Sequence, residues 1–300
     1  MKSFKFLAIF AVISVLCISC KKEGVFSPKN KIDSIYFSST RTAEDLVGNE
    51  WVTIDESSVP KSLEEVWNWE GDLLKSIDYY HHGDFDYTEY YDYEYDNKRL
   101  VSINWGGDVY YSLTYQNGKI STIYLYYTND SSPAEVCVFT HKNGKISQIT
   151  YYDNGYITSE QALKMMRPFR FFLPNSSVES FTKTMCKIHS ENQAKDYEPF
   201  IVQLEWQGNN VKKMTYLNGT HTEVFDYTYD NKLNPYYGLF NMEEFANKPF
   251  LSKNNIIGDG TYEYSYTYDG NRPTTQSCSY TSTYGDFRES INYTYYYEYK

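Results

Sequence analysis

Apolar and aromatic residues alternate with polar ones along most of the chain, with a period of two. The pattern is clear from Tyr262 to Tyr268 and clearest at the C-terminus, at Ile291, Tyr293, Tyr295, Tyr297 and Tyr299. This period is typical of antiparallel β-strands that pack one face and expose the other. The chain is therefore predicted to be built largely from such strands.

Two nearly identical segments show how the strands are connected. Leu113–Ile123 and Phe139–Ile149 both place Asn-Gly between two strand-forming runs. A tight two-residue turn needs positive φ at both central residues, which Asn tolerates and Gly adopts without steric cost. Asn117-Gly118 and Asn143-Gly144 are therefore predicted to be the turns of two β-hairpins.

The hairpin recurs with a fixed spacing, in which an aromatic or His residue before the turn lies eight positions ahead of an apolar residue. The pairs are Trp69 and Ile77, Tyr95 and Ile103, Tyr115 and Ile123, His141 and Ile149, and Trp206 and Met214. Two degenerate units start at Tyr229 and Tyr268, and their returning strands contain Pro235 and Pro273. Because proline cannot donate to a strand ladder, we expect those two strands to be edges, short or interrupted.

The predicted fold class is all-β: a large up-and-down antiparallel meander, curled or barrel-like, forming a single domain over residues 31–300. Before the repeats, only short strands are predicted at Ile32–Phe37 and Trp51–Ile54. Residues 156–199 interrupt the pattern, and one or two short helices are expected near 158–190, where Thr158 and Gln161 could form a capping box. A further short helix is expected at Met242–Ala246.

The N-terminus has the features of an export signal. Lys2 and Lys5 precede the apolar run Phe6–Leu16, and Cys20 follows Ile18-Ser19. This arrangement resembles the lipobox of bacterial lipoproteins, which implies cleavage after residue 19 and lipid on Cys20. The alternatives are an ordinary signal peptide or a membrane anchor, although the run is short for a span.

Residues 20–30 are expected to be a lipidated tether to the outer-membrane lipid bilayer. Lys21-Lys22-Glu23 partly resembles the tags that export some Bacteroidetes lipoproteins to the cell surface. Those tags are usually richer in acidic residues. The sequence therefore leaves periplasmic and surface display open.

The net charge of the chain excludes some classes of binding partner. The formal net charge is −11, and it becomes −13 without residues 1–19, which carry two lysines and no acid. Nucleic-acid binding requires clustered basic residues, so no nucleic-acid partner is expected. On net charge alone, anionic headgroups should repel the protein and leave the lipid as its only membrane attachment. Cys137, Cys186 and Cys278 remain after cleavage, so at least one thiol is free.

The search for metal ligands finds no spacing that defines a site, and no cofactor is expected. His81-His82 is predicted to lie in a solvated turn, and His141 to be structural because it replaces the repeat aromatic. The acidic run Asp84–Asp96 lacks the glycine and terminal glutamate of a calcium loop. Its acids are therefore interpreted as a solvated strand face.

No catalytic residue can be assigned, and we expect the protein not to be an enzyme. The sequence has no G-x-S-x-G elbow, phosphate loop or dinucleotide fingerprint. A pair of carboxylates for glycoside cleavage cannot be chosen among 39 acidic residues. Cys186 and His189 are one helical turn apart, but a lone thiol in an apolar stripe is usually part of a core.

The 34 tyrosines allow two interpretations. Tyrosine is a good strand former that packs ring to ring across strands. Alternatively, some rings line a wet groove and stack on a ligand such as a sugar. The candidate ligand-binding aromatics are Trp105, Trp206 and Tyr236.

The units YDNKRLVSI and QNGKISTI resemble the tyrosine–aspartate repeats of bacterial wrapping and surface proteins. With the signal around Cys20 and the segments NPYYGLF and SKNN, the chain resembles a family of Bacteroidetes lipoproteins of unknown function. The resemblance implies a porin-like antiparallel β fold held outside the cytoplasm by a lipid. It carries no catalytic residues.

The leading hypothesis is a non-catalytic, lipid-anchored envelope protein that binds an extracellular partner, with a glycan as one candidate. A structural or assembly role in the outer envelope is the alternative. A hydrolase built across residues 156–199 and a membrane-spanning barrel rank lower. A barrel would need a Leu- and Val-rich lipid-facing band, which the strands lack.

Overall fold

The computed structural model describes residues 23–26, 28–94, 98–105, 109–127, 133–153, 199–239 and 251–300. The signal peptide 1–19, Cys20 and the helices expected near 158–190 and at Met242–Ala246 lie outside these residues. Within the described ranges, no helix is long and apolar enough to cross a membrane.

The described residues form seventeen β-strands and no α-helix. The strands are β1 (Ile32–Val47), β2 (Glu50–Glu70), β3 (Leu73–His81), β4 (Asp84–Tyr93), β5 (Leu100–Trp105), β6 (Val109–Gln116), β7 (Lys119–Tyr127), β8 (Glu135–Lys142), β9 (Lys145–Asp153), β10 (Phe200–Gln207), β11 (Asn210–Asn218), β12 (His221–Asp226), β13 (Thr228–Leu233), β14 (Asn254–Gly258), β15 (Tyr264–Asp269), β16 (Arg272–Tyr284) and β17 (Phe287–Tyr299).

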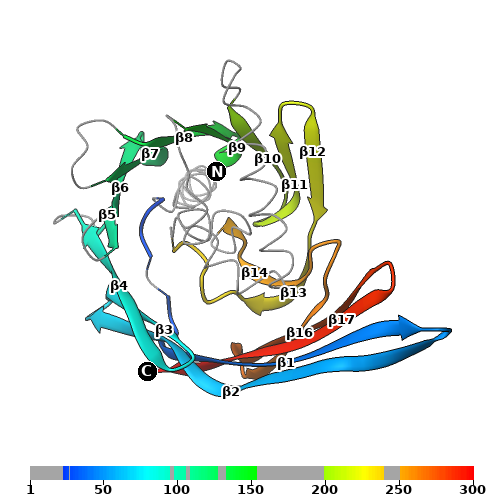
Figure 1. Cartoon of the computed structure of the whole chain (residues 1–300). Coiled ribbons are helices and arrows are strands. Elements are labelled where there is room, and N and C mark those ends of the chain that lie inside the picture. The colour runs from blue at the N-terminus through cyan, green and yellow to red at the C-terminus, as the bar shows by residue number, and fades with distance from the viewer. Residues whose placement is uncertain are drawn as a thin grey trace, which may run out of the picture.

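Fifteen strands make one antiparallel sheet in the order β12-β11-β10-β9-β8-β7-β6-β5-β4-β3-β2-β1-β17-β16-β15. Sequence neighbours pair throughout, and the C-terminal β17 joins the N-terminal β1. Strands β13 and β14 form a separate pair that lies inside the curve of the large sheet (Figure 1). The prediction of a large antiparallel meander is confirmed, but the sheet is curled without being closed, because β12 and β15 do not pair.

The first two strands are much longer than predicted. Ile32–Phe37 and Trp51–Ile54 are parts of β1 and β2, which span 16 and 21 residues. Their distal halves mix polar residues with scattered apolar ones such as Val47 and Ile54, so they lack the regular alternation that identifies a strand. They are held instead by pairing, since β1 lies between β2 and β17 along most of its length.

Pro235 and Pro273 have different effects. Strand β13 is short and ends at Leu233, before Pro235, as expected. The expectation is wrong for Pro273, because β16 is a 13-residue strand between β15 and β17. Pro273 is the second residue of β16, beside the turn, where the missing donor disrupts little pairing.

The two Asn-Gly turns have the predicted geometry. Asn117 and Asn143 have φ of 53° and 54°, and Gly118 and Gly144 both have φ of 78°. Positive φ at both positions is the type I′ arrangement that matches the twist of a hairpin. The repeated hairpin is therefore confirmed in both copies.

Each hairpin also contains a β-bulge that the spacing did not predict. In the β6–β7 hairpin, Thr114 pairs with Thr122 but Tyr115 pairs with Ile120, which leaves Ser121 out of register. The same shift occurs at the positions corresponding to Tyr115 in five other hairpins, at Trp69, Tyr93, His141, Trp206 and Tyr268. In the β4–β5 unit this residue is Tyr93, not the Tyr95 that the eight-residue spacing predicted. The bulge therefore belongs to the repeat.

The aromatic residue at the bulge position binds the neighbouring hairpin. The polar atom of its side chain donates a hydrogen bond to a backbone carbonyl of the preceding hairpin. That carbonyl lies at the beginning of the hairpin's second strand. Tyr115 Oη, for example, donates to Leu100 O at 2.7 Å. The equivalent bonds are Trp69 Nε1 to Ile32 O (2.7 Å), Tyr93 Oη to Leu74 O (2.7 Å), Trp206 Nε1 to Ile146 O (2.6 Å), Tyr229 Oη to Val211 O (2.6 Å) and Tyr299 Oη to Pro273 O (2.9 Å). We call this contact the repeat clip. A buried carbonyl next to a bulge needs a donor, which explains why the repeat uses Tyr or Trp rather than Phe.

The core fills the concave side of the sheet. Its largest fully buried side chains include Trp67, Tyr91, Ile77, Ile103 and Ile149. They form one cluster with residues of β13, β14 and the N-terminal segment, which runs inside the curve (Figure 1). The inward tyrosines are thus packed side chains, as the simpler interpretation of the tyrosine content expected.

The antiparallel order gives the sheet two different rims. The rim that carries the tight turns at Gly71, Gly118, Gly144, Gly208 and Gly270 is called the turn rim here. The opposite rim carries the other described connections, together with the end of β9 and the start of β10. At that rim the distal ends of β1, β2, β16 and β17 extend beyond the neighbouring strands (Figure 1), and they are called the projecting sheet.

Candidate functional site

Two buried carboxylates form the most unusual cluster on the concave face. Glu89 on β4 is 0% exposed. Its Oε2 accepts hydrogen bonds from Tyr79 Oη at 2.9 Å and Tyr91 Oη at 3.0 Å. Its Oε1 accepts a bond from Trp105 Nε1 at 3.2 Å. Three donors from three adjacent strands therefore surround one side chain.

The second carboxylate is Glu65 on β2, which is 3% exposed. Its Oε2 accepts a bond from Trp67 Nε1 at 2.7 Å, and Glu65 is paired in register with Tyr79 of β3. Burial raises the pKa of Glu65 to about 8, although the bond from Trp67 opposes the shift. Burial also raises the pKa of Glu89 to about 7, against the three donors.

This cluster corrects the interpretation of Asp84–Asp96 as a solvated acidic face. Asp84, Asp86 and Asp92 are exposed, but Glu89 has the same parity as Tyr91 and points into the core. Because side chains alternate along a strand, one acid in the run is carried inward with the aromatics. Polar donors on β3, β4 and β5 compensate for its burial.

Neither carboxylate is placed to act on a substrate. Both are shielded from solvent, and both are hydrogen-bonded to the rings that pack on them. With pKa values near neutrality, they can instead bind or release a proton as the pH changes. Their chemistry therefore concerns the stability of the sheet.

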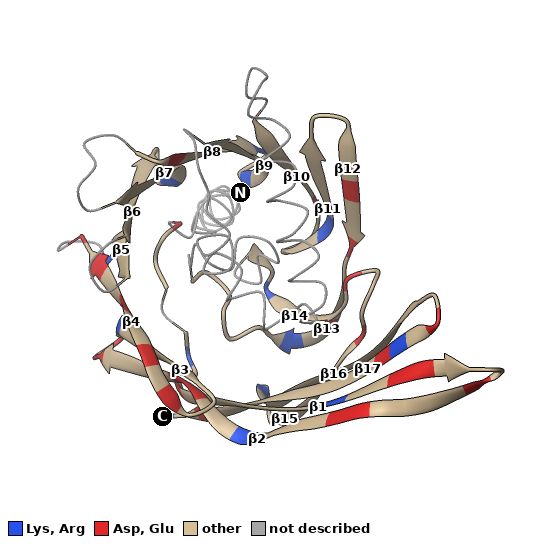
Figure 2. Cartoon of the chain, in the orientation of Figure 1, with Lys and Arg blue, Asp and Glu red and all other residues tan. Residues whose placement is uncertain are grey.

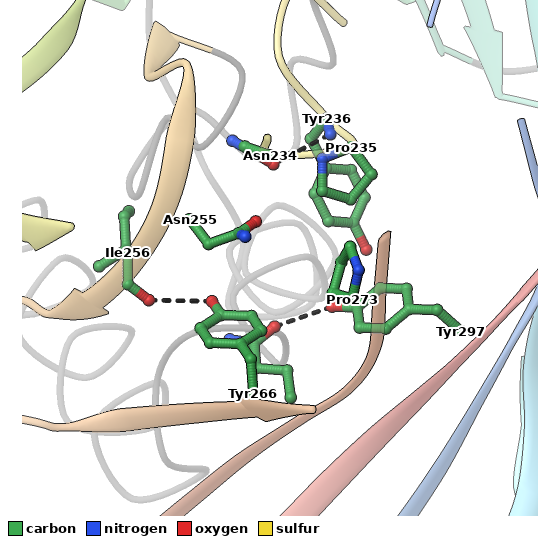
Figure 3. Close-up of a pocket in the computed structure, with 9 residues that line it drawn as sticks. Asn234, Pro235, Tyr236, Asn255, Ile256, Tyr266, Pro273 and Tyr297 are labelled. Atoms are coloured by element: carbon green, nitrogen blue, oxygen red, sulfur yellow. Dashed lines mark hydrogen bonds between the residues drawn. The ribbon is translucent and has the colours of Figure 1, made fainter. Parts of the chain in front are cut away.

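A small cavity lies between the segment around Tyr236, β14, β15, β16 and β17 (Figure 3). Tyr236 packs on Trp67 with 6.0 Å between ring centroids, and it lines the cavity with Asn255, Gln276 and Tyr297. Tyr297 Oη donates to Gln276 Oε1 at 2.8 Å. The space holds about one water molecule, which is too little for a sugar or a cofactor.

The three candidate ligand-binding aromatics are placed separately and make internal contacts. Trp105 donates to Glu89, and Trp206 makes a repeat clip to Ile146. Tyr236 is buried beside the cavity. Four strands lie between β5 and β10 in the sheet, so the structure does not bring Trp105 and Trp206 together.

A different set of aromatics lies on the convex face. Tyr90, Asn104, Tyr110 and Tyr126 are in register across β4, β5, β6 and β7. The rings of Tyr110 and Tyr126 stack with centroids 5.0 Å apart and an interplanar angle of 10°. Next to this row, Tyr124 is registered with Val136 and Val136 with Tyr152. We call Tyr90, Tyr110, Tyr124, Tyr126 and Tyr152 the outer tyrosine strip.

The strip is accessible to a partner. Tyr90 is 50% exposed and Tyr152 is 47% exposed, while the other three rings are half-buried by one another and by their neighbours. Polar side chains lie in register with the rings, including Asn104 beside Tyr110 and Ser112 beside Tyr124. The strip thus combines flat apolar faces with hydrogen-bonding groups.

Comparisons with known proteins show a distant likeness in fold to a solved structure. No family model and no curated protein matches the chain. The crystal structure of a porin-like protein from Bacteroides uniformis aligns with a TM-score of 0.48 and 10% identity, over 93% of this chain and 100% of that chain. This degree of likeness assigns no family and no activity.

The structure gives no support for a metal site within the residues it describes. Those residues contain no group of three or more His, Cys, Asp or Glu side chains that could hold an ion. Cys137 and Cys278 are buried and form no disulfide, while Cys186 and His189 lie outside the described ranges. His82 has φ of 53° in the β3–β4 turn, where it was predicted.

The outer tyrosine strip could have been predicted from the alternation of side chains along each strand. Tyr91 and Leu113 mark the inward set of their strands, so Tyr90 and Tyr110 must point outward. Aromatic residues at outward positions have no core to join. The candidate aromatics were chosen by type rather than by face, and that choice missed the strip.

Proposed function

We propose that this protein is a non-catalytic, lipid-anchored component of the cell envelope that binds a glycan through the outer tyrosine strip. The observation that carries the proposal is the row of Tyr90, Tyr110 and Tyr126 on the convex face. Exposed aromatic side chains that lie next to one another on the outer face of a sheet mark an interaction site. The attachment through Cys20 rests on the signal-like N-terminus.

The geometry of the strip favours a sugar chain as the partner. A pyranose ring has apolar C–H faces that stack on flat aromatic rings, and hydroxyls that bond to groups such as Asn104 and Ser112. The row crosses four strands and therefore extends over about 14 Å, the scale of a short oligosaccharide. Because Tyr110 and Tyr126 already stack on each other, binding would order few additional side-chain rotamers.

Calorimetric titration of the full-length protein with a panel of polysaccharides tests this proposal. Tyr110→Ala and Tyr126→Ala should each weaken binding about tenfold or more, because central aromatic contacts dominate such interfaces. Tyr284→Ala is the matched control, since Tyr284 is an exposed tyrosine on the projecting sheet. It should leave the affinity unchanged. Failure to bind any polysaccharide would remove the glycan from the proposal.

The projecting sheet favours an assembly role as the second candidate. β3 pairs only with residues 65–70 of β2, so residues 50–64 present an unpaired edge next to β1. An open edge is a template for strand addition by another protein. A proline at a residue of 50–58 whose N–H points away from β1 would remove a donor from this edge and should abolish such an association without changing glycan binding.

A hydrolytic function has no comparable support. Glu65 and Glu89 are the carboxylates with raised pKa among the described residues, as a general acid would require. Both are enclosed by aromatic rings and cannot contact a substrate. Their raised pKa follows from packing.

A further inference from the structure

The N-terminal segment is fixed to the turn rim. Glu23 N donates to Gly118 O at 3.3 Å, and Ile120 N donates to Glu23 Oε2 at 2.8 Å. His141 Nε2 is 3.1 Å from the same carboxylate oxygen, and Lys119 Nζ is 3.2 Å from Oε1. His141 occupies the repeat-clip position of its hairpin, and Glu23 is its partner there.

The next residues continue along the same rim toward β1. Gly24 O accepts a bond from Leu100 N at 2.9 Å, and Phe26 is buried with its ring 5.9 Å from that of Trp69. Gly24 has φ of 81°, and a Cβ there would lie 2.1 Å from Tyr115 Oη. Only glycine therefore fits. The part of the predicted tether that the structure describes is packed against the hairpins.

This docking limits how far a lipid on Cys20 could be from the rim. Cys20 precedes Glu23 by three positions, and an extended chain covers at most about 11 Å over that length. The lipid would therefore be attached within about that distance of Glu23, which is bound to the β6–β7 and β8–β9 hairpins.

The charge of these two hairpins differs from that of the whole protein. Lys119, Lys142 and Lys145 flank their turns, which contain no acidic residue. The projecting sheet at the opposite rim carries mainly acids, including Glu44, Asp55 and Glu56. Figure 2 shows red bands along the distal ends of β1, β2 and β17, and blue segments at β7 and near β9.

We propose that the turn rim at β6–β9 is the surface that faces the bilayer, with Lys142 and Lys145 contacting anionic headgroups while Lys119 neutralises Glu23. The inference rests on the proposed lipidation of Cys20 and adds the orientation of the whole sheet. The opposite rim, with the projecting sheet, then points away from the membrane. Net charge alone gave the opposite expectation because it sums the basic turns at β6–β9 with acids elsewhere, including those of the projecting sheet.

The orientation can be measured on the lipidated full-length protein in phosphatidylcholine vesicles that contain phosphatidylglycerol and a headgroup-linked quencher. A fluorophore is placed at Gln116→Cys on the turn rim or at Thr283→Cys on the projecting sheet, in a Cys186→Ser background. Both positions are exposed, and Cys137 and Cys278 are buried. Quenching is expected at 116 and not at 283. Equal quenching, or stronger quenching at 283, would overturn the orientation.

A charge variant tests the headgroup contact itself. Lys142→Gln should weaken attraction to the phosphatidylglycerol surface by about fivefold. It should also lower the quenching at 116 toward the value in pure phosphatidylcholine. Lys61→Gln is the matched control, because Lys61 is an exposed lysine on β2 away from the turn rim. An equal effect of both variants, or of neither, would contradict the basic contact.

Intact-mass measurement separates the two proposals. A mass without acyl chains, together with failure to float with vesicles, would overturn the lipid anchor and the inference that depends on it. An acylated protein with equal quenching at both sites would overturn the orientation while the anchor stands.

Discussion

Glu89 combines complete burial with three hydrogen-bond donors, and the balance between the two sets its charge. Its pKa is raised to about 7 because desolvation outweighs the bonds from Tyr79, Tyr91 and Trp105. Tyr79 has a pKa well above its ordinary value, chiefly through burial, so its hydroxyl remains a donor over the physiological range. At the residue scale, the concave face therefore carries an acid that is partly protonated near neutral pH.

This environment predicts a pH-dependent stability. An unfolded glutamate has a pKa of about 4.3, so the folded protein binds the proton more tightly. The stabilising contribution is fully present below about pH 4 and is lost as the pH rises through about 7. For Glu89 the change is on the order of 3 kcal/mol. Between pH 5 and 8.5, the Tm of the Glu89→Gln variant should decrease less with rising pH than the Tm of the unmodified protein.

Glu56→Gln is the control for this measurement, because Glu56 is an exposed acid on β2. It should leave the pH dependence unchanged. A Glu89→Gln protein with the same pH slope as the unmodified protein would show that Glu89 is charged in the fold.

The repeat clip explains how successive hairpins are joined. Each bulge leaves a backbone carbonyl at the start of the returning strand, and the ring of the next unit donates to it. Two bulge positions make other contacts. His141 faces Glu23 of the N-terminal segment, and Tyr268 Oη donates to Asp230 Oδ2. At the element scale, the aromatic before the turn therefore sets the contact between units, while Asn-Gly sets the turn.

Removing one repeat clip should therefore lower the free energy of unfolding more than removing an ordinary surface hydroxyl. Tyr115→Phe keeps the ring but leaves Leu100 O without its donor, which should cost about 1–3 kcal/mol. Tyr126→Phe on the outer strip should stay within about 0.5 kcal/mol. Urea unfolding followed by tryptophan fluorescence measures both. If both variants are equally stable, the clip contributes nothing to the joining of hairpins.

Stability is distributed unevenly over the whole molecule. The core lies between the concave face, β13 and β14, whereas the projecting sheet exposes apolar residues such as Val47 and Ile54. Its strands are held by backbone pairing and by ion pairs, including Arg288 with Glu44 at 2.6 Å and Arg41 with Asp55 at 2.7 Å. Exposed ion pairs contribute little. We therefore expect the projecting sheet to open before the rest.

A pair of substitutions tests this distribution. Ile103→Ala in the core should lower the free energy of unfolding by about 2–5 kcal/mol. Ile54→Ala, at a residue that is 54% exposed, should change it by no more than about 0.5 kcal/mol. Hydrogen exchange should also be faster at residues 44–56 than at β3–β7. Equal protection of the two regions would mean that the projecting sheet belongs to the same cooperative unit.

The sequence by itself determined the repeated hairpin, the Asn-Gly turns and the antiparallel meander, because period-two patterning and positive φ at Asn117 and Asn143 are local properties. Tertiary structure alone decided the length of β1 and β2, the inward position of Glu89 among its donors, and the docking of Glu23 on the turn rim. These depend on which strands become neighbours, and long-range pairing such as that of β1 with β17 leaves no trace in local alternation. The same reason separates the packed inner tyrosines from the outer strip, since a ring's exposure depends on what covers its face.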